Sequence, residues 1–332
     1  MSAAPEVAVV IPTHDRIAML GEAVASVLAE RTVALQVVVV DDASSDGTAA
    51  WLAALSDPRV EHESLDPGRG GSGARNVGLE RCRAPHVLFL DDDDVVEPGA
   101  IPALLGALSR HPRAVRAVGA HRVFGTAVRS RRATHPRVPM TLRTWRAELV
   151  AWNMPPGAVL WRTAVVRQLG GWDETLRRAE DAELCLRAWE HPATLIPDTV
   201  LRYRYHASQV PTPQAWPLDW AARRGFVESL PAGPRAEGER LMHCRELYQQ
   251  ALEHHLEGRF GAAASGFAAV VRADPRLALS PLTGPYLDGL LVRAALGAAL
   301  PHSMAAPISG WRRRRRGRVP DTRRAPSADD QG

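Results

Sequence analysis

The segment "HVLFLDDDDVVEP", residues 86–98, joins a short apolar run to a run of aspartates. Residues 86–90 have the character of a buried strand. The carboxylates that follow are Asp91, Asp92, Asp93 and Asp94. They place like charges side by side, and a hard divalent cation such as Mg²⁺ or Mn²⁺ would turn that repulsion into a binding site. A solvated acidic turn before a helix is the competing interpretation. We favour the metal site because the run ends a buried strand.

Apolar runs and helical patterns alternate on both sides of this segment. Strands are predicted at 7–12, 35–42, 59–65 and 86–90, and helices at 17–30, 47–55, 73–82 and 100–110. Continuous apolar strands that alternate with helices indicate a mostly parallel sheet covered on both faces. The sequence therefore predicts an α/β fold for the first half of the chain.

Polar residues gather where the predicted strands end. They are Thr13, His14 and Asp15 after the first strand, Asp41 and Asp42 at the end of the second, and the four aspartates after 90. Ligands of such sheets bind beyond the carboxyl ends of the strands. From chemistry alone, two interpretations of Asp41 and Asp42 are equally supported. They are either ordinary strand-end residues or acceptors of hydrogen bonds from a base or ribose. Ser45 or Asp46 is interpreted as a helix cap.

Residues 68–73 contain the spacing G-x-G-x-x-G, which is typical of dinucleotide-binding loops. That fingerprint belongs in the first strand-to-helix turn, after a strongly apolar strand. Here the first turn is "PTHDR", and the glycines follow a polar segment. We therefore reject the dinucleotide interpretation and predict a flexible loop that leads into a helix, with Arg75 available to a base or phosphate.

The alternation loosens after residue 111. Residues 129–146 are basic and contain proline, which predicts an exposed excursion, while 157–162 and 194–206 resemble strands. A helix over 180–189 would bury Ala182, Cys185, Leu186 and Trp189. Glu180 and Asp181 lie at its start, where capping and the helix dipole explain acidic residues without a catalytic role.

The domain organisation follows from composition. We predict an α/β domain over 1–210 and a helical region over 211–303, beginning with a linker at 211–217. The helical region would serve packing, homodimerisation or acceptor binding. The last segment, 304–332, is rich in Arg, Pro and Asp, so a disordered tail is expected.

Composition narrows the class of protein. The 332 residues are 45% hydrophobic, carry a net charge of +4 and include no lysine. Three separated cysteines indicate neither a disulfide framework nor a metal site. No apolar run approaches a spanning helix or a signal-peptide core, so we expect a cytoplasmic protein. The arginine cluster at 311–318 would allow peripheral contact with the inner face of a membrane or with a polyanion.

Six segments occur in the order and spacing found in family 2 glycosyltransferases. They are "VAVVIPTHDR", "VVVVDDASSDGT", "GGSGARNVGL", "VLFLDDDD", "GGWDE" and "EDAELCLR". The chain resembles that family from about residue 5 to 206. The resemblance implies a GT-A fold, a nucleoside-diphosphate sugar donor, of which a UDP-sugar is the first expectation, and inverting transfer to an acceptor hydroxyl.

The resemblance also implies roles for particular residues. The nucleoside pocket would be lined by Pro12, Thr13, Asp41, Asp42, Arg75, Asp91 and Asp92. The family's D-x-D motif corresponds to 91–93, so the metal would be held by Asp91, Asp93 and, from "YRYH", His206. Glu180 and Asp181 match the family's acidic pair, with Asp181 as the general base. The resemblance thus reverses the capping interpretation of Asp181.

Three other functions compete with sugar transfer. A sugar-phosphate nucleotidylyltransferase would need a glycine-rich basic loop after the first strand, where this chain has "PTHDR". A non-catalytic nucleotide-sugar-binding protein would be expected to lack Asp181 or the D-x-D, and this chain has both. A nucleic-acid-binding role rests on the arginine tail alone, without a base-reading motif.

Overall fold

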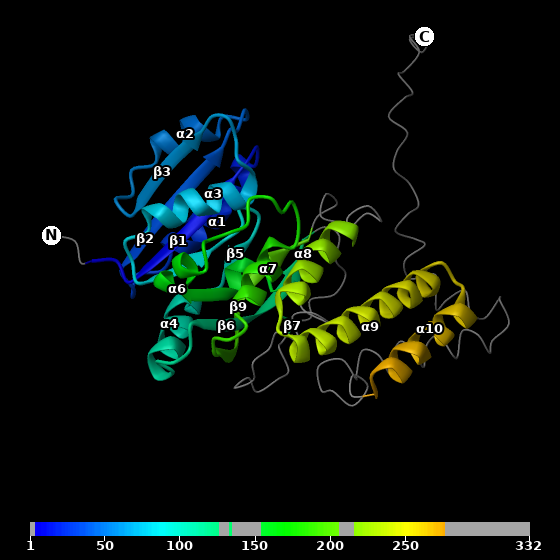
Figure 1. Cartoon of the computed structure of the whole chain (residues 1–332). Coiled ribbons are helices and arrows are strands. Elements are labelled where there is room, and N and C mark those ends of the chain that lie inside the picture. Colours follow the sequence, from blue (N-terminus) through cyan, green and yellow to red (C-terminus); the bar gives the residue numbers. More distant parts are fainter. Residues whose placement is uncertain (1–3, 126–132, 135–153, 206–215, 276–332) are drawn as a thin grey trace, which may run out of the picture. The chain divides into compact units, whose positions relative to one another are not determined.

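The computed structural model describes residues 4–125, 133–134, 154–205 and 216–275 (Figure 1). The described residues belong to two compact units, one within 1–239 and one beginning at 240. The functional division into 1–210, 211–303 and 304–332 remains a prediction.

The first unit is built on one sheet with the strand order β3-β2-β1-β4-β8-β6-β9-β5. The four strands nearest the N-terminus are β1 (Val7–Thr13), β2 (Leu35–Asp42), β3 (Val60–Leu65) and β4 (His86–Phe89). They pair in parallel. The chain leaves β1 toward β2 on one side, whereas β4 joins β1 on the other side, so the strand order reverses between β1 and β4. Sheets of this kind bind ligands at that reversal.

Helices cover both faces of the sheet, as the apolar strands predicted (Figure 1). On one face, alternate residues of β1 pack with α1 (Ile17–Leu28), α2 (Thr48–Ala54) and α4 (Ala100–Arg110). On the other face, the intervening residues pack with α3 (Gly70–Arg81), α6 (Thr163–Gln168) and α7 (Glu180–Arg187). Because side chains alternate along a strand, a fully apolar β1 buries both of its faces.

Gly78 lets α3 approach β1 closely. A Cβ atom built at Gly78 would lie 2.3 Å from Val10 Cγ1. Gly78→Ala should therefore destabilise the fold by about 1–3 kcal/mol, the usual cost of overpacking a core. Gly106→Ala in α4 is the matched control, because its Cβ would meet only the mobile end of Arg110, at 3.3 Å. That control should leave stability unchanged or raise it by about 0.5–1 kcal/mol. Denaturant unfolding of both variants measures the difference, and equal stabilities would contradict the packing account.

In the described part of the chain, the second half of the sheet contains five further strands, of which the sequence pattern predicted two. They are β5 (Val95–Val96), β6 (Arg116–Phe124), β7 (Ala133–Thr134), β8 (Val159–Arg162) and β9 (Ala193–Arg204). A 3₁₀ turn, Pro156–Ala158, precedes β8. The predicted strands at 157–162 and 194–206 correspond to β8 and β9. The long β6 was not predicted, because its arginines and His121 interrupt the apolar pattern.

A buried arginine explains how β6 tolerates a charge. Arg116 is 2% exposed, and its guanidinium lies 4.9 Å from the ring centroid of Trp161. It also donates a hydrogen bond of 3.0 Å to the carbonyl oxygen of Cys185 in α7. The residue thus ties β6 to the helix that begins at Glu180.

Helices alone follow the sheet in the described residues up to 275. They are α8 (Trp216–Ser229), α9 (Ala232–Leu256) and α10 (Phe260–Ala273). In the second unit, Cys244 and Ala251 of α9 pack with Ala263, Phe267 and Val270 of α10. The predicted helical region is confirmed over these residues, with α8 starting inside the predicted linker at 211–217.

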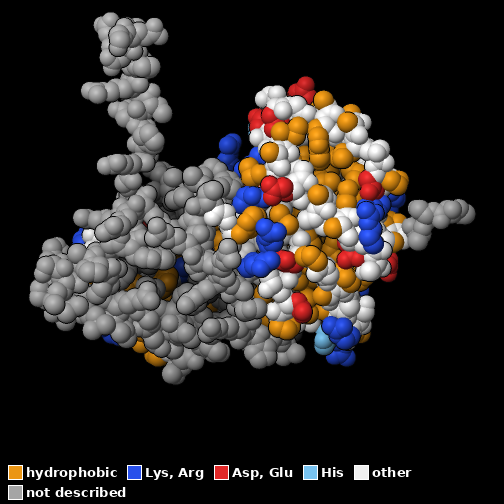
Figure 2. Space-filling view, turned by 180° about the vertical axis from the view of Figure 1, so that it is seen from behind, with side chains coloured by type: hydrophobic (Ala, Val, Ile, Leu, Met, Phe, Trp, Pro, Cys, Tyr) orange, Lys and Arg blue, Asp and Glu red, His pale blue; other side chains and the backbone are white. Residues whose placement is uncertain are grey.

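Several predictions concern residues outside those that the structure describes: the tail 304–332 with its cluster at 311–318, His206, and most of the excursion 129–146. None of the helices in the described ranges has the length and apolar character needed to cross a membrane. On the described part of the face in Figure 2, basic and acidic side chains lie interspersed with apolar ones.

Candidate active site

The polar residues at the strand ends meet where the strand order reverses. Thr13 ends β1, and the four aspartates follow β4 beside it. The Thr13 hydroxyl donates a hydrogen bond of 2.8 Å to Asp92 Oδ2. This bond joins residues 79 positions apart at the reversal point, where a ligand is expected.

The four adjacent aspartates divide into two groups. Asp92 turns toward the loop after β1, where it accepts a second hydrogen bond, of 2.9 Å, from Arg16. Asp91, Asp93 and Asp94 instead face one another, and one carboxylate oxygen from each lies within 4.8 Å of the others. That separation fits three carboxylates around one divalent cation.

Asp94 joins this cluster through a buried carboxylate. Asp94 is 0% exposed, and its Oδ1 accepts a 2.8 Å hydrogen bond from the backbone N–H of Arg204. Oδ2 is buried and has no hydrogen-bond partner among the described residues. Burial, together with the charges of Asp91 and Asp93, raises the pKa of Asp94 well above its ordinary value. A bound cation would stabilise the ionised form of Asp94 strongly, because its carboxyl group is buried, has a raised pKa and lies beside two further carboxylates.

Arg75 links the aspartate cluster to the second acidic pair. It lies on α3, is 6% exposed, and donates a 2.6 Å hydrogen bond to Asp91 and a 3.3 Å hydrogen bond to Glu180. Its guanidinium also lies 4.6 Å from the ring centroid of Trp172. Arg75 therefore holds Asp91 and Glu180 on either side of one positive charge. Trp172, from "GGWDE", stabilises the Arg75 guanidinium through this cation–π contact.

Glu180 and Asp181 begin α7, as the sequence predicted. Burial and the neighbouring Glu180 carboxylate raise the pKa of Asp181 to about 7. A 2.7 Å hydrogen bond from the Ala182 N–H and the charge of Arg223 oppose that rise. A carboxyl group with a pKa near 7 is half ionised at neutral pH, which suits a general base.

The helix after this pair buries the predicted face. Ala182 and Cys185 are each 5% exposed and Leu186 is 0% exposed. The helix ends at Arg187, so Trp189 lies beyond it and is only partly buried. The predicted contact face is thus correct except at its last residue.

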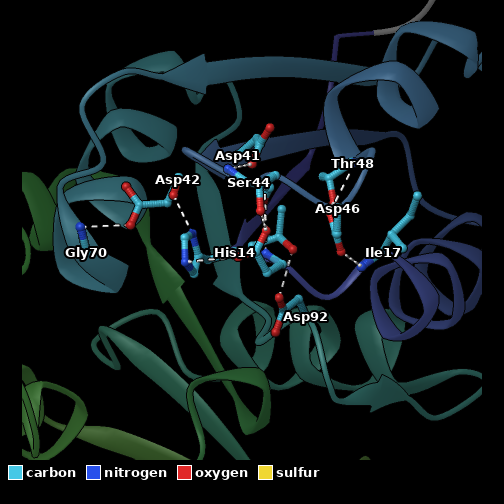
Figure 3. Close-up of polar contacts among 12 residues, drawn as sticks. His14, Ile17, Asp41, Asp42, Ser44, Asp46, Thr48, Gly70 and Asp92 are labelled. Atoms are coloured by element: carbon cyan, nitrogen blue, oxygen red, sulfur yellow. Dashed lines mark hydrogen bonds and ion pairs between the residues drawn. The ribbon is translucent and has the colours of Figure 1, made fainter.

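The aspartates at the end of β2 organise loops. Asp42 accepts hydrogen bonds of 2.6 Å and 2.8 Å from the backbone N–H groups of Arg69 and Gly70, at the start of α3 (Figure 3). Asp41 accepts a 3.0 Å bond from the N–H of Ser44. The sequence did not predict these backbone contacts, and the roles proposed for Asp41 and Asp42 in nucleoside binding remain predictions.

The remaining loop residues are also fixed. Asp46 accepts hydrogen bonds from the N–H groups of Ile17, at 3.0 Å, and Thr48, at 3.1 Å, so it ties together the starts of α1 and α2 (Figure 3). The cap predicted at Ser45 or Asp46 is wrong, because the N-cap residue of α2 is Gly47, whose backbone adopts the left-handed conformation there. Pro12 is buried within β1, opposite Val40 of β2. Two residues of the site were not predicted, namely Arg16 and Trp172. Asp94 belongs to the acidic run predicted to bind a cation, but the D-x-D resemblance did not assign it to the metal. Trp172 lies in a segment that carried the family resemblance, and this was the available signal for it.

Known proteins resemble this chain in sequence. Residues 8–170 match the family model "Glycosyl transferase family 2". A succinoglycan biosynthesis protein, ExoO, of Rhizobium meliloti is 40% identical over 30% of this chain and 29% of its own length. A pre-mycofactocin glycosyltransferase of Mycobacterium tuberculosis is 30% identical over 67% of this chain and 46% of its own length. The chain thus spans less than half of these curated relatives.

Solved structures share the fold. Residues 1–349 of S. aureus TarS, solved with UDP-GlcNAc, superpose with a TM-score of 0.59 at 16% identity over 93% of this chain and 92% of the other. The mannosyltransferase PcManGT of Pyrobaculum calidifontis, solved with GDP-Man and Mn²⁺, gives a TM-score of 0.57 at 19% identity over 89% and 87%. The predicted GT-A fold is confirmed. Together with the sequence match over residues 8–170, the shared fold shows that the chain belongs to glycosyltransferase family 2.

Proposed function

We propose that the protein transfers a sugar from a nucleoside-diphosphate sugar to an acceptor hydroxyl with inversion at the anomeric carbon. The observation that carries this proposal is the juxtaposition of two acidic groups, one after β4 and the other at the start of α7. Asp91, Asp93 and Asp94 lie within 4.8 Å of one another, and Arg75 joins Asp91 to the pair Glu180–Asp181. A diphosphate and an acceptor hydroxyl need two such groups side by side.

The three clustered carboxylates fit Mg²⁺ or Mn²⁺, because both are hard cations that prefer carboxylate oxygens. The buried, unpartnered Oδ2 of Asp94 supports this assignment. When bound, the cation supplies neutralisation of the charge that develops on the leaving diphosphate. In the proposal Asp91, Asp93 and Asp94 hold it, and His206 remains a predicted further ligand.

The donor is proposed to lie over the ends of β1 and β4. Thr13 is fixed there by its bond to Asp92, and Pro12 precedes it in β1. Together with Asp41, Asp42 and Arg75, these residues would line the nucleoside pocket. The donor proposed first is a UDP-sugar, because TarS, which shares the fold, was solved with UDP-GlcNAc and with UDP. The neighbour solved with GDP-Man makes GDP the second candidate.

Asp181 is proposed to take the proton from the acceptor hydroxyl while its oxygen attacks the anomeric carbon from the face opposite the diphosphate. A positioned base of this kind contributes roughly 10²–10⁴ in rate. Glu180, paired with Arg75 at 3.3 Å, holds the base next to the donor side of the site. The acceptor is left as an unassigned hydroxyl compound.

Calorimetry with UDP, GDP and ADP in Mn²⁺ tests the donor assignment. We expect UDP to bind more tightly than ADP, with slow hydrolysis of the matching nucleotide sugar. Binding without any hydrolysis or transfer would favour the non-catalytic nucleotide-sugar-binding alternative. Pyrophosphate release from UTP and a sugar phosphate would favour the nucleotidylyltransferase. If none of the three nucleotides binds, the proposed function is wrong.

A further inference from the structure

Three arginines surround the aspartate cluster, and they differ in how firmly they are held. The Arg75 side chain is 7% exposed and is fixed by Asp91, Glu180 and the Trp172 ring. Arg204 donates a 2.7 Å hydrogen bond to the backbone carbonyl of Asp93 and pairs with Glu22 at 2.6 Å. Both are therefore part of the framework around the cluster.

Arg16 differs because it contacts two carboxylates of the aspartate run and also reaches solvent. A single nitrogen of its guanidinium lies 2.9 Å from Asp92 Oδ1 and 3.1 Å from Asp93 Oδ2. Its side chain is 38% exposed, whereas the Asp92 and Asp93 side chains are 5% and 3% exposed. The two carboxylates are thus fixed inside the protein, while the cation that pairs with them has room to withdraw.

The backbone at Arg16 is fixed, so only its side chain is able to move. Its carbonyl oxygen accepts bonds of 3.0 Å from the N–H groups of Met19 and Leu20, in the first turn of α1. The next residue, Ile17, is tied to Asp46 by a 3.0 Å bond. On the other side, the Asp15 N–H donates a 2.9 Å hydrogen bond to Ser44 Oγ, and Asp15 Oδ1 accepts a 2.6 Å hydrogen bond from the Ser45 N–H.

Asp92 and Asp93 would respond differently to withdrawal of the guanidinium. Asp92 would keep its 2.8 Å hydrogen bond from Thr13. Asp93 belongs to the three-carboxylate cluster, so a divalent cation and Arg16 compete for the same side chain. A unit charge a few ångströms from a divalent cation costs about 1–2 kcal/mol even at the dielectric constant of water.

We propose that Arg16 is an internal counter-ion of the metal site, which pairs with Asp93 until a divalent cation binds and displaces it. This inference rests on the metal assignment within the proposed function. It makes Arg16 a positioning residue that sets the affinity for the cation, because Arg16 weakens cation binding by competing for Asp93.

Manganese titrations of the full chain test the inference without any turnover. Arg16→Gln should bind Mn²⁺ about three- to thirty-fold more tightly than the wild type, the factor expected when one nearby positive charge is removed. Arg16→Lys keeps the charge and should stay close to the wild type. The matched control is Arg113→Gln, which should change nothing. Arg113 is exposed and precedes the start of β6, at the opposite end of the strands from the aspartate cluster.

Unchanged or weaker Mn²⁺ binding by Arg16→Gln would overturn the counter-ion role. A second measurement uses the wild type alone, so it does not depend on how the variant folds. The NMR signal of the Arg16 guanidinium should shift as Mg²⁺ is added, and a constant signal through saturation would refute displacement. If the wild type binds UDP but no Mn²⁺, the metal assignment fails together with this inference while the donor assignment stands. If it binds Mn²⁺ but no nucleotide, the proposed function fails while the Arg16 result still decides the inference.

Discussion

Replacing Asp181 with asparagine should lower the rate of sugar transfer by roughly 10²–10⁴-fold and leave donor affinity nearly unchanged. Asparagine keeps the size of the side chain and its ability to accept the Ala182 N–H, which is 2.7 Å from Asp181 Oδ1. It cannot take a proton. The measurement is turnover together with calorimetric donor affinity, because a damaged fold would lower both.

The matched control for this variant is Glu183→Gln on the same helix. Glu183 pairs with Arg187 one turn away, so its charge serves the helix. Its replacement should leave turnover near the wild-type value. Equal turnover in the Asp181→Asn variant and the wild type would show that Asp181 has only a capping role.

The pH dependence of the wild type should report the same group. With its pKa raised to about 7 by burial and by Glu180, Asp181 is protonated below that pH and becomes a base above it. Turnover should therefore rise as pH passes through about 7. Glu180 and Asp91 push this pKa upward, whereas Arg223 lowers it, so the measured value reflects all three neighbours.

The free energy of unfolding should show the opposite dependence on pH. A folded-state pKa above the unfolded value means that the native state binds the proton more tightly, so stability falls as pH rises from about 4 to about 7. Asp181→Asn removes that dependence. Its melting temperature at pH 8 should be at least as high as that of the wild type.

Removal of the divalent cation should weaken UDP binding by roughly 10²-fold or more, since even the outer partners of metal ligands contribute 10–100-fold. The physical reason is that three carboxylates within 4.8 Å repel a diphosphate unless a cation lies between them. Calorimetry with UDP in Mn²⁺ and in EDTA measures the effect.

Asp93→Ala should behave like EDTA treatment. Asp198→Ala is the matched control, because Asp198 is an exposed aspartate of β9. This variant should bind UDP as the wild type does. Equal UDP affinity in Mn²⁺ and EDTA would contradict the metal assignment. Loss of binding in both variants would point to a general effect of lost charge.

The first half of the fold was predictable because its strands are buried on both faces. A run such as "VVVV" in β2 has no other stable environment than a covered parallel sheet. The strand β6 was missed because Arg116 and His121 break its apolar pattern, and only the tertiary contacts of Arg116 with Trp161 and α7 explain its burial. Local pattern cannot reveal a partner that lies 69 residues away along the chain.

The candidate site was predictable as a set of residues but not as a set of contacts. Strand-end aspartates and the pair Glu180–Asp181 are visible in the sequence. Their division of labour depends on how the chain turns after β4, which sends Asp92 to Thr13 and Arg16 and leaves Asp94 in the cluster. Four identical adjacent residues carry no signal of that kind. Asp42 likewise holds the start of α3 through a loop 27 residues later.

A crystal structure of the full chain with UDP and Mn²⁺ tests the central claim most directly. Anomalous scattering would locate the manganese independently of any assumption about its ligands. The account predicts a peak about 2 Å from carboxylate oxygens of Asp93 and Asp94, with the UDP diphosphate on the same ion and the uracil over the ends of β1 and β2. A manganese peak away from this cluster, or UDP bound elsewhere on the molecule, would contradict it.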